Sequence, residues 1–422
     1  MFVTNKSITR IIIKRFLITI AIILFIRIGS FIPIPGVNLI DLALFIEKDS
    51  ATTNLASLFS GKGTFKIGLF TLSIVPYINA SIITQILVKS VPSLSKLQKE
   101  GDLYSRRSIN RLTRFIALIV ALFQSISLGL YLKPILFDWN IGLLLEIVIS
   151  LTTGSMVVLW LSEVITEYGL GNGPSILVLT NILLTYQNIN KGLIKETENN
   201  LSISSLLINC SFFLFATCII AKLQEGIRKV PIISSKQLKI KSEFSDFTEN
   251  YIPFRINEAG ILPIILTTSI LVLPNYFNNI GISLDIFSLF SQLNLPYIDE
   301  FLKIIYWLSY FVFIIVFSLF YTQIALNSKD LADQLKKMAV ALPGLRPGNQ
   351  TAFFLKKLIE RVTFIGSFLL ATVATLPNII AILFGRSDFT GLGISSLVII
   401  TGILIDLERE IDDIVFSNIY LA

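Results

Sequence analysis

The chain has 422 residues, of which 53% are hydrophobic, with a mean hydropathy of +0.76 and a formal net charge of +7. A soluble domain is about 45–50% apolar, and here the excess is gathered into blocks of roughly 20 residues, the length at which a helix crosses a hydrocarbon core. This excludes a soluble globular protein and predicts membrane-spanning helices, because lipid cannot hydrogen-bond a bare backbone.

The apolar blocks predict an all-α polytopic membrane protein with about ten transmembrane helices. Residues 51–66 are too short and polar to span the bilayer, and residues 223–258 and 326–353 form two long polar loops. The expected spans are 16–34, 67–89, 112–132, 143–165, 174–189, 203–222, 259–275, 301–325, 354–376 and 391–413. They divide the chain into an N-terminal half, residues 1–190, and a C-terminal half, residues 191–422.

The basic residues predict the orientation of these spans. Most of the 35 Lys and Arg residues fall in the N-terminal segment and in every second loop, including both long polar loops. The positive-inside rule therefore places both termini on the cytoplasmic side, or its organellar equivalent. The net positive charge belongs to these loops and requires no nucleic acid as a partner.

A proline soon after the start of the second helix in each half indicates an internal repeat. These are Pro76 and Pro263. Paired interruptions in corresponding helices are typical of an inverted repeat with a functional site between its halves, although proline is also common in ordinary membrane helices.

Little in the sequence indicates catalysis, a metal site or a cofactor. Residues 61–66 (GKGTFK) resemble half of a phosphate-binding loop, but the glycine that such a loop needs five residues before Gly61 is missing, and Gly63 follows the lysine where the loop needs Ser or Thr. The chain has no histidine, which is the commonest general base and metal ligand. The acidic cluster at 406–413 is expected to be a solvated face of the last helix. We therefore expect no enzyme and no cofactor.

Charge inside the predicted spans is scarce, and Arg27 in the first helix is its clearest case. An arginine at the bilayer centre costs about 2.5–3.5 kcal/mol on insertion scales, so Arg27 must face protein or water. One arginine does not make an ion pathway, and the pattern favours a mostly apolar conduit.

Seven motifs together resemble the SecY family, in its order and spacing, from about residue 7 to residue 418. They are RIGSFIPIPG (27–36), PYINASIITQIL (76–87), KEGD…RR (99–107), ITEYGLGNGPSIL (165–177), YIPFRINEAGILP (251–263), DLADQLKKM (330–338) and LPGLRPGNQTA (342–352). The resemblance implies a protein-conducting channel of two five-helix halves, which passes unfolded precursors across the membrane and membrane helices sideways into it.

The resemblance also implies functional residues. A pore ring of aliphatic side chains maps onto Ile74, Ile78, Val178, Ile265 and Val398. Residues alone would make each an ordinary core or lipid-facing side chain. Pro174 stands where the family usually has a further aliphatic residue, so its membership of the ring is left open.

Three further features follow from the resemblance. Residues 51–66 match the plug that closes the idle channel, with a plain surface loop as the alternative. Gln85 and Asn257 match polar positions of the lateral gate, with interhelical hydrogen bonding as the alternative. Arg346, framed by Pro and Gly, and Lys236 match the surface that docks partners, although Gln237 replaces the second base expected there.

The function expected from the resemblance is that of the central channel subunit of a Sec translocon. Its implied partners are a SecE-type subunit, a SecG-type subunit, a SecA-type ATPase, the ribosome, precursor proteins and membrane lipid. The alternatives are a small-solute secondary transporter and a structural membrane scaffold. The abundance of Ile, Phe, Asn and Lys favours a plastid-encoded protein of the thylakoid membrane, with a bacterial plasma membrane as the alternative.

Overall fold

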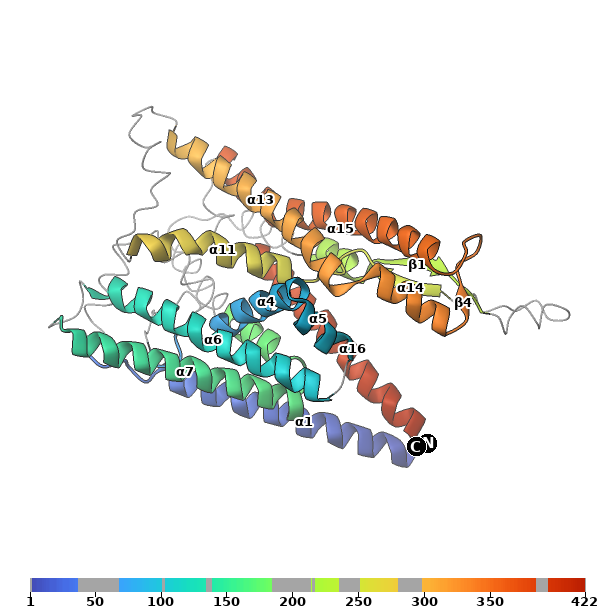
Figure 1. Cartoon of the computed structure of the whole chain (residues 1–422). Helices are drawn as coiled ribbons and strands as arrows, with labels where there is room; N and C mark the ends of the chain where they lie inside the picture. The colour runs from blue at the N-terminus through green and yellow to red at the C-terminus, as the bar shows by residue number, and fades with distance from the viewer. Residues whose placement is uncertain are drawn as a thin grey trace, which may run out of the picture. The chain divides into compact units, whose positions relative to one another are not determined.

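The computed structural model describes residues 2–36, 68–100, 103–133, 139–183, 214, 217–234, 251–279, 298–384 and 394–421. Long helices dominate these residues (Figure 1). They are α1 (Phe2–Ser30), α4 (Val75–Ser90), α5 (Pro92–Glu100), α6 (Leu103–Tyr131), α7 (Ile141–Tyr168), α11 (Leu262–Asn279), α13 (Ile298–Ala325), α14 (Ser328–Lys337), α15 (Asn349–Phe384) and α16 (Ile394–Leu421). A further helix, Gly173–Leu183, follows α7, and residues 217–225 are also helical.

Four helical stretches among the described residues are long and apolar enough to cross a membrane. They are Tyr104–Leu130, Ile141–Tyr168, Ile305–Lys337 and Asn349–Thr375. Each of the ten predicted spans overlaps a helix in the part of it that the structure describes. The expectation of an all-α polytopic membrane protein is confirmed in its class.

The chain forms two compact units. The first comprises Met1–Asn209, Ser269–Asp299 and Gly391–Ala422, and the second comprises Cys210–Thr268 and Glu300–Thr390. The division into halves at residue 190 stays a prediction.

Small side chains allow the helices of the first unit to pack closely. There α4 packs on α6, α6 on α7 and α7 on α1. Ala80 of α4 and Ala121 of α6 are fully buried, and Ala117, one turn before Ala121, is 1% exposed. Small residues are what membrane helices use to bring their backbones together. This packing fixes α4; one predicted ring residue, Ile74, immediately precedes this helix, and another, Ile78, lies in its first turn.

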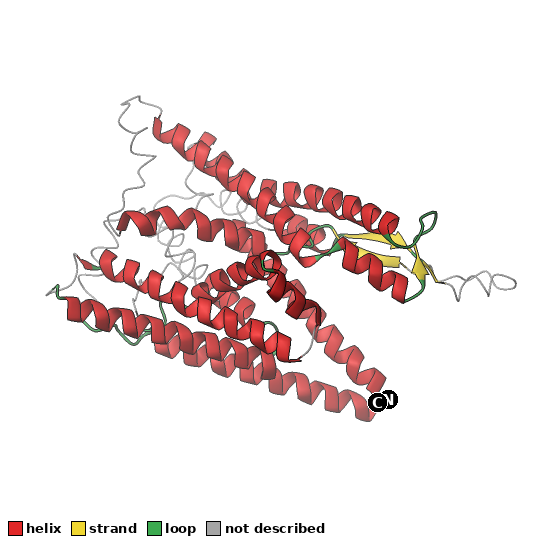
Figure 2. Cartoon of the chain, in the orientation of Figure 1, coloured by secondary structure: helices red, strands yellow, loops and turns green. Residues whose placement is uncertain are grey.

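The two long polar loops of the second unit carry short strands and a helix, which the sequence analysis did not predict (Figure 2). Strand β1 (Ile227–Pro231) pairs antiparallel with β3 (Tyr251–Arg255), and β2 (Ile233–Ser234) pairs antiparallel with β4 (Val340–Ala341). Helix α14 packs on α15. A core joins these elements, made of Val230, Phe254, Ala332, Leu335, Leu342, Leu355 and Ile359. These loops are therefore a folded module with its own core.

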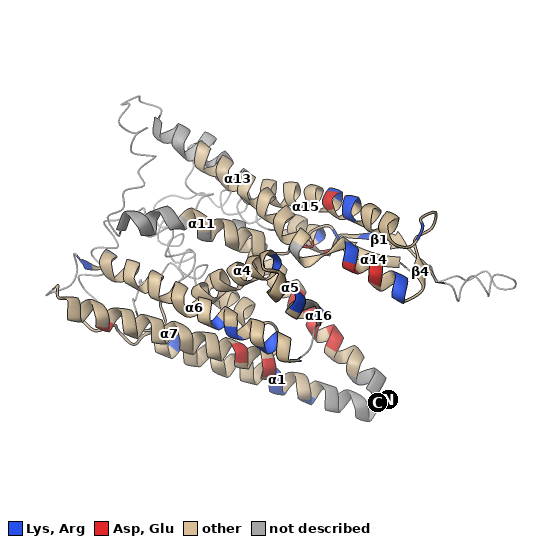
Figure 3. Cartoon of the chain, in the orientation of Figure 1, with Lys and Arg blue, Asp and Glu red and all other residues tan. Residues whose placement is uncertain are grey.

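Charge is concentrated on this loop module. Asn327 caps α14 by accepting the Lys329 amide at 3.2 Å, and Lys336 and Lys337 lie in the last turn, where cations favour the helix dipole. Figure 3 shows charged residues on β1, on α14 and in the first part of α15, whereas residues 305–325 of α13 include none. A folded charged module attached to apolar helices is suited to meeting a partner in water.

Candidate functional site

Two predicted ring residues lie at the start of α4, and both are buried. Ile74 immediately precedes the helix and is 1% exposed, and Ile78, one turn later, is 7% exposed. The amides of Tyr77 and Ile78 both donate to the carbonyl oxygen of Ile74, at 3.1 and 3.2 Å. Pro76, in the first turn, needs no partner because it has no N–H. The two isoleucines thus share one face of a regular helix start.

The start of α11 repeats this arrangement 187 residues further on (residue 78 to residue 265). The amides of Ile264 and Ile265 donate to the carbonyl oxygen of Ile261, at 3.0 and 3.3 Å. Pro263 again lies in the first turn. Ile265, the predicted ring residue of this unit, is 9% exposed and stands at the position that corresponds to Ile78.

The turn before each of these helices contains one residue in the left-handed region. Ser73 has φ 48° before α4, and Gly260 has φ 62° at the same offset before α11. In both turns this residue donates its amide to the carbonyl three residues earlier. The acceptors are Phe70, at 2.9 Å, and Asn257, at 3.3 Å.

Each turn is anchored to the end of the preceding helix by a matching backbone hydrogen bond. The Leu69 amide donates to the carbonyl of Ile32, and the Ile256 amide donates to the carbonyl of Gly226, both at 2.9 Å. The adjacent antiparallel pairs also match; they are Pro33 with Gly68 and Ile227 with Arg255.

At each anchor, a glycine of another helix lies directly against the backbone of the anchored segment. A Cβ at Gly154 of α7 would overlap the carbonyl oxygen of Leu69, and a Cβ at Gly366 of α15 would overlap that of Ile256. A residue with a side chain would push the anchored segment away. Gly154 therefore helps to fix where α4 begins, and Gly366 helps to fix where α11 begins.

These correspondences support the repeat that the two prolines suggested. The helix end, the antiparallel pair, the left-handed turn, the proline and the isoleucine recur in order in the two units. Their inverted relation stays a prediction.

A chain of polar side chains holds the turn before α4. The Arg27 Nη2 donates to Asn181 Oδ1 at 2.8 Å, and Asn181 Nδ2 donates to Ser73 Oγ at 3.0 Å. Arg27 thus faces protein, as the insertion cost of a charge requires. Its partner, 154 residues away, left no signal in the sequence.

The other ring residues lie on two further helices of the first unit. Val178 is half-buried on the helix Gly173–Leu183, three residues before Asn181, and Val398 in α16 is 1% exposed. The structure brings Ile74 and Ile78 together on α4, and the complete ring stays a prediction.

Glu410 contacts the turn between α7 and the next helix, a role that the sequence analysis missed. Its Oε1 accepts the Gly171 amide at 3.1 Å, where Gly171 has φ 85°. The prediction of a wholly solvated acidic cluster is therefore wrong for this residue.

Two threonines hold the rest of that turn. Thr19 Oγ1 in α1 accepts the Leu170 amide at 3.0 Å, and Thr166 Oγ1 accepts the Gly173 amide at 2.9 Å. The backbone at the start of the helix is thus bound to α1, α7 and α16. Pro174, half-buried in the first turn of this helix, suits the fold there, and its ring membership stays open.

The two predicted gate residues are placed differently. Gln85 is half-buried on α4. Asn257 is 6% exposed, and its Nδ2 donates to the carbonyl of Gly260 at 3.0 Å, so it stabilises the turn before α11. Its Oδ1 is buried and has no hydrogen-bond partner among the described residues. A gate role for either residue stays a prediction.

The predicted docking tip is a rigid turn between β4 and α15. Gly344 has φ 79° and Gly348 has φ 116°, conformations that favour glycine. Arg346 is exposed between them, and its carbonyl accepts the Thr351 hydroxyl at 2.9 Å. Leu345 packs against the core of the module, so the tip is anchored beside the exposed arginine.

The second predicted docking residue, Lys236, and the predicted plug at 51–66 lie outside the described residues. Strand β1, earlier in the same loop of the sequence, carries Lys229, whose Nζ lies 4.7 Å from the centre of the Tyr251 ring.

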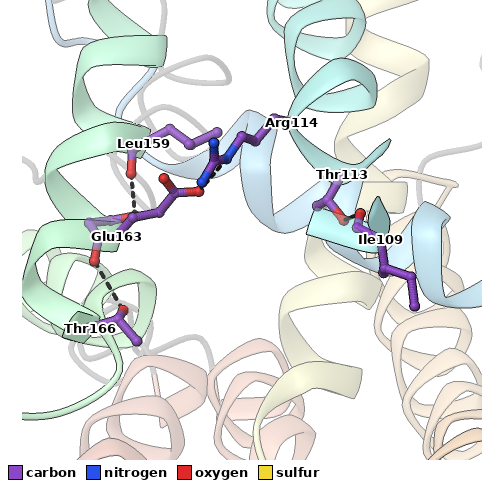
Figure 4. Close-up of polar contacts among 7 residues, drawn as sticks. Ile109, Thr113, Arg114, Leu159, Glu163 and Thr166 are labelled. Carbon is purple, nitrogen blue, oxygen red and sulfur yellow. Dashed lines mark hydrogen bonds and ion pairs between the residues drawn. The ribbon is translucent and has the colours of Figure 1, made fainter. Parts of the chain in front are cut away.

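An ion pair near the end of α7 joins it to α6. Arg114 Nε lies 2.8 Å from Glu163 Oε1 (Figure 4). Both side chains are partly exposed, so the pair contributes about 0–1 kcal/mol. Among the described residues, no group of three or more Cys, Asp or Glu could hold a metal ion.

Comparison with known proteins decides the family. The sequence profile of the SecY family matches residues 68–407. The chain is 50% identical over 413 residues to a protein translocase subunit SecY of Trieres chinensis, covering 97% of this chain and 96% of that protein. It is 40% identical over 410 residues to the SecY of Guillardia theta, covering 96% and 95%. The chain belongs to the SecY family.

Solved structures agree with the SecY fold. One, described as the structure of a protein conducting channel, matches with a TM-score of 0.67 at 14% identity, covering 97% of this chain and 94% of that one. Sec61 from a canine ribosome–channel complex matches with a TM-score of 0.64 at 15% identity, with the same coverage. The family assignment supports the channel hypothesis over the transporter alternative.

Proposed function

We propose that this chain is the central protein-conducting channel subunit of a Sec translocon. It passes unfolded precursors across the membrane and releases membrane helices sideways into the lipid. The proposal rests on membership of the SecY family and on one structural observation: the same anchored turn precedes α4 and α11, and a buried isoleucine follows it each time.

The seal of the idle channel is a ring formed by Ile74, Ile78, Val178, Ile265 and Val398. An apolar constriction excludes ions by dewetting, yet aliphatic side chains can part around a peptide. The anchored turns support this role. A ring of side chains can close only if the helices that carry them begin at a fixed depth in the membrane. Residues 51–66 form the plug, and Gln85 and Asn257 line the lateral gate.

Partners that supply energy dock on the charged loop module. The exposed Arg346, held between two left-handed glycines, presents a guanidinium fork that can bind a carboxylate or a phosphate. A SecA-type ATPase and the ribosome use this tip together with Lys236. The chain itself needs no catalytic group or cofactor for this work.

A SecE-type subunit braces the two halves, and a SecG-type subunit completes the complex. The membrane is the plastid thylakoid, with the cytosol-like stromal side facing the loop module and both termini. The algal relatives and the residue composition support this location.

Site-specific photocross-linking tests the proposal. A photoreactive residue is placed at Ile78 or Ile265, the complex is reconstituted with SecE- and SecA-type partners, and a secretory precursor is stalled in transit. Ile149 of α7, which is 59% exposed, is the matched control site. We expect precursor adducts at residues 78 and 265 and none at residue 149.

Two other outcomes contradict parts of the proposal. A precursor that engages the complex but labels neither ring site shows that the ring is wrongly assigned. A precursor that never engages argues against the translocon itself.

A further inference from the structure

We propose that Arg27 and Asn181 are positioning residues that hold Ser73 in its left-handed conformation and thereby keep the ring end of α4 closed in the idle channel. This inference rests on the proposed channel function. It assigns a role to the charged residue in the first span that the sequence analysis could not explain.

The polar chain joins three segments of the first unit that are distant in sequence. Arg27 comes from α1, Asn181 from the helix Gly173–Leu183, and Ser73 from the turn before α4. Ser73 is 8% exposed, so its hydroxyl has little access to water. A hydrogen bond to a charged donor is roughly twice as strong as a neutral one, which makes Arg27 an effective anchor for the Asn181 amide.

Ser73 needs such an anchor because its backbone is strained. A residue with a Cβ populates the left-handed region unfavourably, and Ser73 has φ 48° there. In the second unit the equivalent position is Gly260, with φ 62° and nothing within 4 Å of a Cβ built on it. Glycine adopts this conformation without strain.

The second unit also lacks the arginine. The offset of 194 that relates Ile32 to Gly226 places Ala221 at the position of Arg27. In the second unit the turn has an unstrained glycine, and the earlier helix has an alanine in place of the arginine. In the first unit the turn has a strained serine, and the earlier helix has the arginine. This covariation within one chain is what is expected if the polar chain exists to hold the serine.

Release of Ser73 would move the residue next to it. Ile74 follows Ser73 directly, and its carbonyl starts α4 by accepting two amides. A change of the Ser73 backbone therefore redirects the first turn of α4, including Ile78. In the proposed channel this loosens the ring from one side.

The test measures how well the idle channel is sealed at the ring. The two cysteines, Cys210 and Cys218, are replaced by serine, and Ile78→Cys is introduced. The complete complex is reconstituted in vesicles without a precursor, and the rate at which a small membrane-impermeant thiol reagent modifies residue 78 is measured. Ion conductance of the idle channel is recorded in parallel without the Ile78→Cys substitution.

Breaking the chain of hydrogen bonds from Arg27 through Asn181 to Ser73 should open the ring. We expect Asn181→Leu to raise both the modification rate and the idle conductance by roughly tenfold, because the left-handed serine then loses its support. Arg27→Met should give a smaller rise, since the bond between Asn181 and Ser73 remains. The double variant should not exceed Asn181→Leu, because both substitutions break one chain.

Rescue by glycine separates this inference from a general loss of stability. Ser73→Gly on the Asn181→Leu background copies the second unit and should return both readouts to within about twofold of the parent. Ser73→Gly also relieves strain by itself, so the same glycine is added to a variant destabilised elsewhere, Gly154→Ala, where it should not restore the seal.

Matched controls use polar residues of the same helices or of the same unit. Thr180→Val removes a hydroxyl that, among the described residues, donates only to the Leu177 carbonyl of its own helix, at 2.9 Å, and Arg114→Met removes the ion pair with Glu163. Both should leave the seal unchanged.

Unchanged readouts in Asn181→Leu, or failure of the glycine to restore the seal, would overturn the inference. Precursor transport by the parent complex is measured in the same vesicles. If the parent transports precursor while Asn181→Leu stays sealed, the inference fails and the channel function stands. If the parent transports nothing, the channel function fails.

Discussion

Gly154 of α7 packs its Cα directly against the carbonyl oxygen of Leu69, so that even a methyl group at residue 154 would overlap this oxygen. The contact joins a long membrane helix to the segment that leads into α4. Gly366 of α15 makes the same contact with Ile256 in the second unit. Each unit therefore positions the helix that carries a predicted ring residue through a backbone contact that only glycine permits.

Alanine at these glycines should destabilise the protein although alanine favours helices. Gly154→Ala and Gly366→Ala should each lower the free energy of unfolding by about 1–3 kcal/mol, because the overlap is with backbone and cannot be relieved by a rotamer change. Thermal unfolding of the purified complex in detergent measures this. Gly142→Ala is the control in α7, since nothing lies within 4 Å of a Cβ there, and it should be neutral or stabilising. An equal loss in all three variants would contradict the contact.

The hydrogen bond between Glu410 and the Gly171 amide should contribute to stability. Glu410→Ala should cost about 1 kcal/mol, because the amide loses a charged acceptor in a partly buried turn. Glu408→Ala is the matched control, since Glu408 is exposed two residues away on α16. Protease resistance of the turn at 169–173 and the melting temperature are the measurements. Similar values for the two variants would show that Glu410 is an ordinary solvated acid.

Reversing the charge at the docking tip should weaken partner binding without affecting insertion. Arg346→Glu should lower affinity for a SecA-type ATPase or a ribosome by about tenfold, or ~1.4 kcal/mol, because a guanidinium is replaced by a carboxylate. Binding to reconstituted vesicles measures the affinity, and precursor export should fall with it. Normal export by a correctly inserted Arg346→Glu variant would remove the docking assignment.

Thr351→Val separates the shape of the tip from its charge. It removes the hydroxyl that bonds the Arg346 carbonyl but keeps the arginine. We expect a smaller loss of affinity than for Arg346→Glu, since the tip becomes less rigid while its charge remains.

The core of the loop module should be needed for docking even though it contacts no partner. Leu355 of α15 is fully buried in the core that this helix shares with β1, β3 and α14, so Leu355→Ala should cost about 2–5 kcal/mol of module stability. In this variant the loops should be cleaved faster by protease, and affinity for the partner should fall with the loss of stability. Phe353→Ala, at a 70% exposed position two residues earlier, should change neither the stability nor the protease resistance.

The fold class and the family followed from the sequence because their signals are local. Apolar blocks have the length of a bilayer, and motifs such as 251–263 keep their residues together in the chain. Pro76 and Pro263 indicated a repeat for the same reason. The strands were missed because β1 and β3 are short and lie in polar segments with no regular alternation.

The polar contacts could not be predicted, because their partners are far apart in sequence. Arg27 and Asn181 are separated by 154 residues, and Gly171 and Glu410 by 239. No periodicity within a helix marks such a pair. The cost of burying Arg27 indicated only that this residue had to face protein or water.

The anchors before the two ring helices also bear on how the chain is made. Leu69 bonds to Ile32, 37 residues earlier, and Ile256 bonds to Gly226, 30 residues earlier. Each helix–turn unit can therefore close as soon as its own residues have emerged from the ribosome, since short loops close quickly and domains fold in the order of synthesis. The glycine contacts come later, when α7 and α15 are complete. Assembly of the channel would then proceed twice through the same two steps, once for each half of the newly made chain.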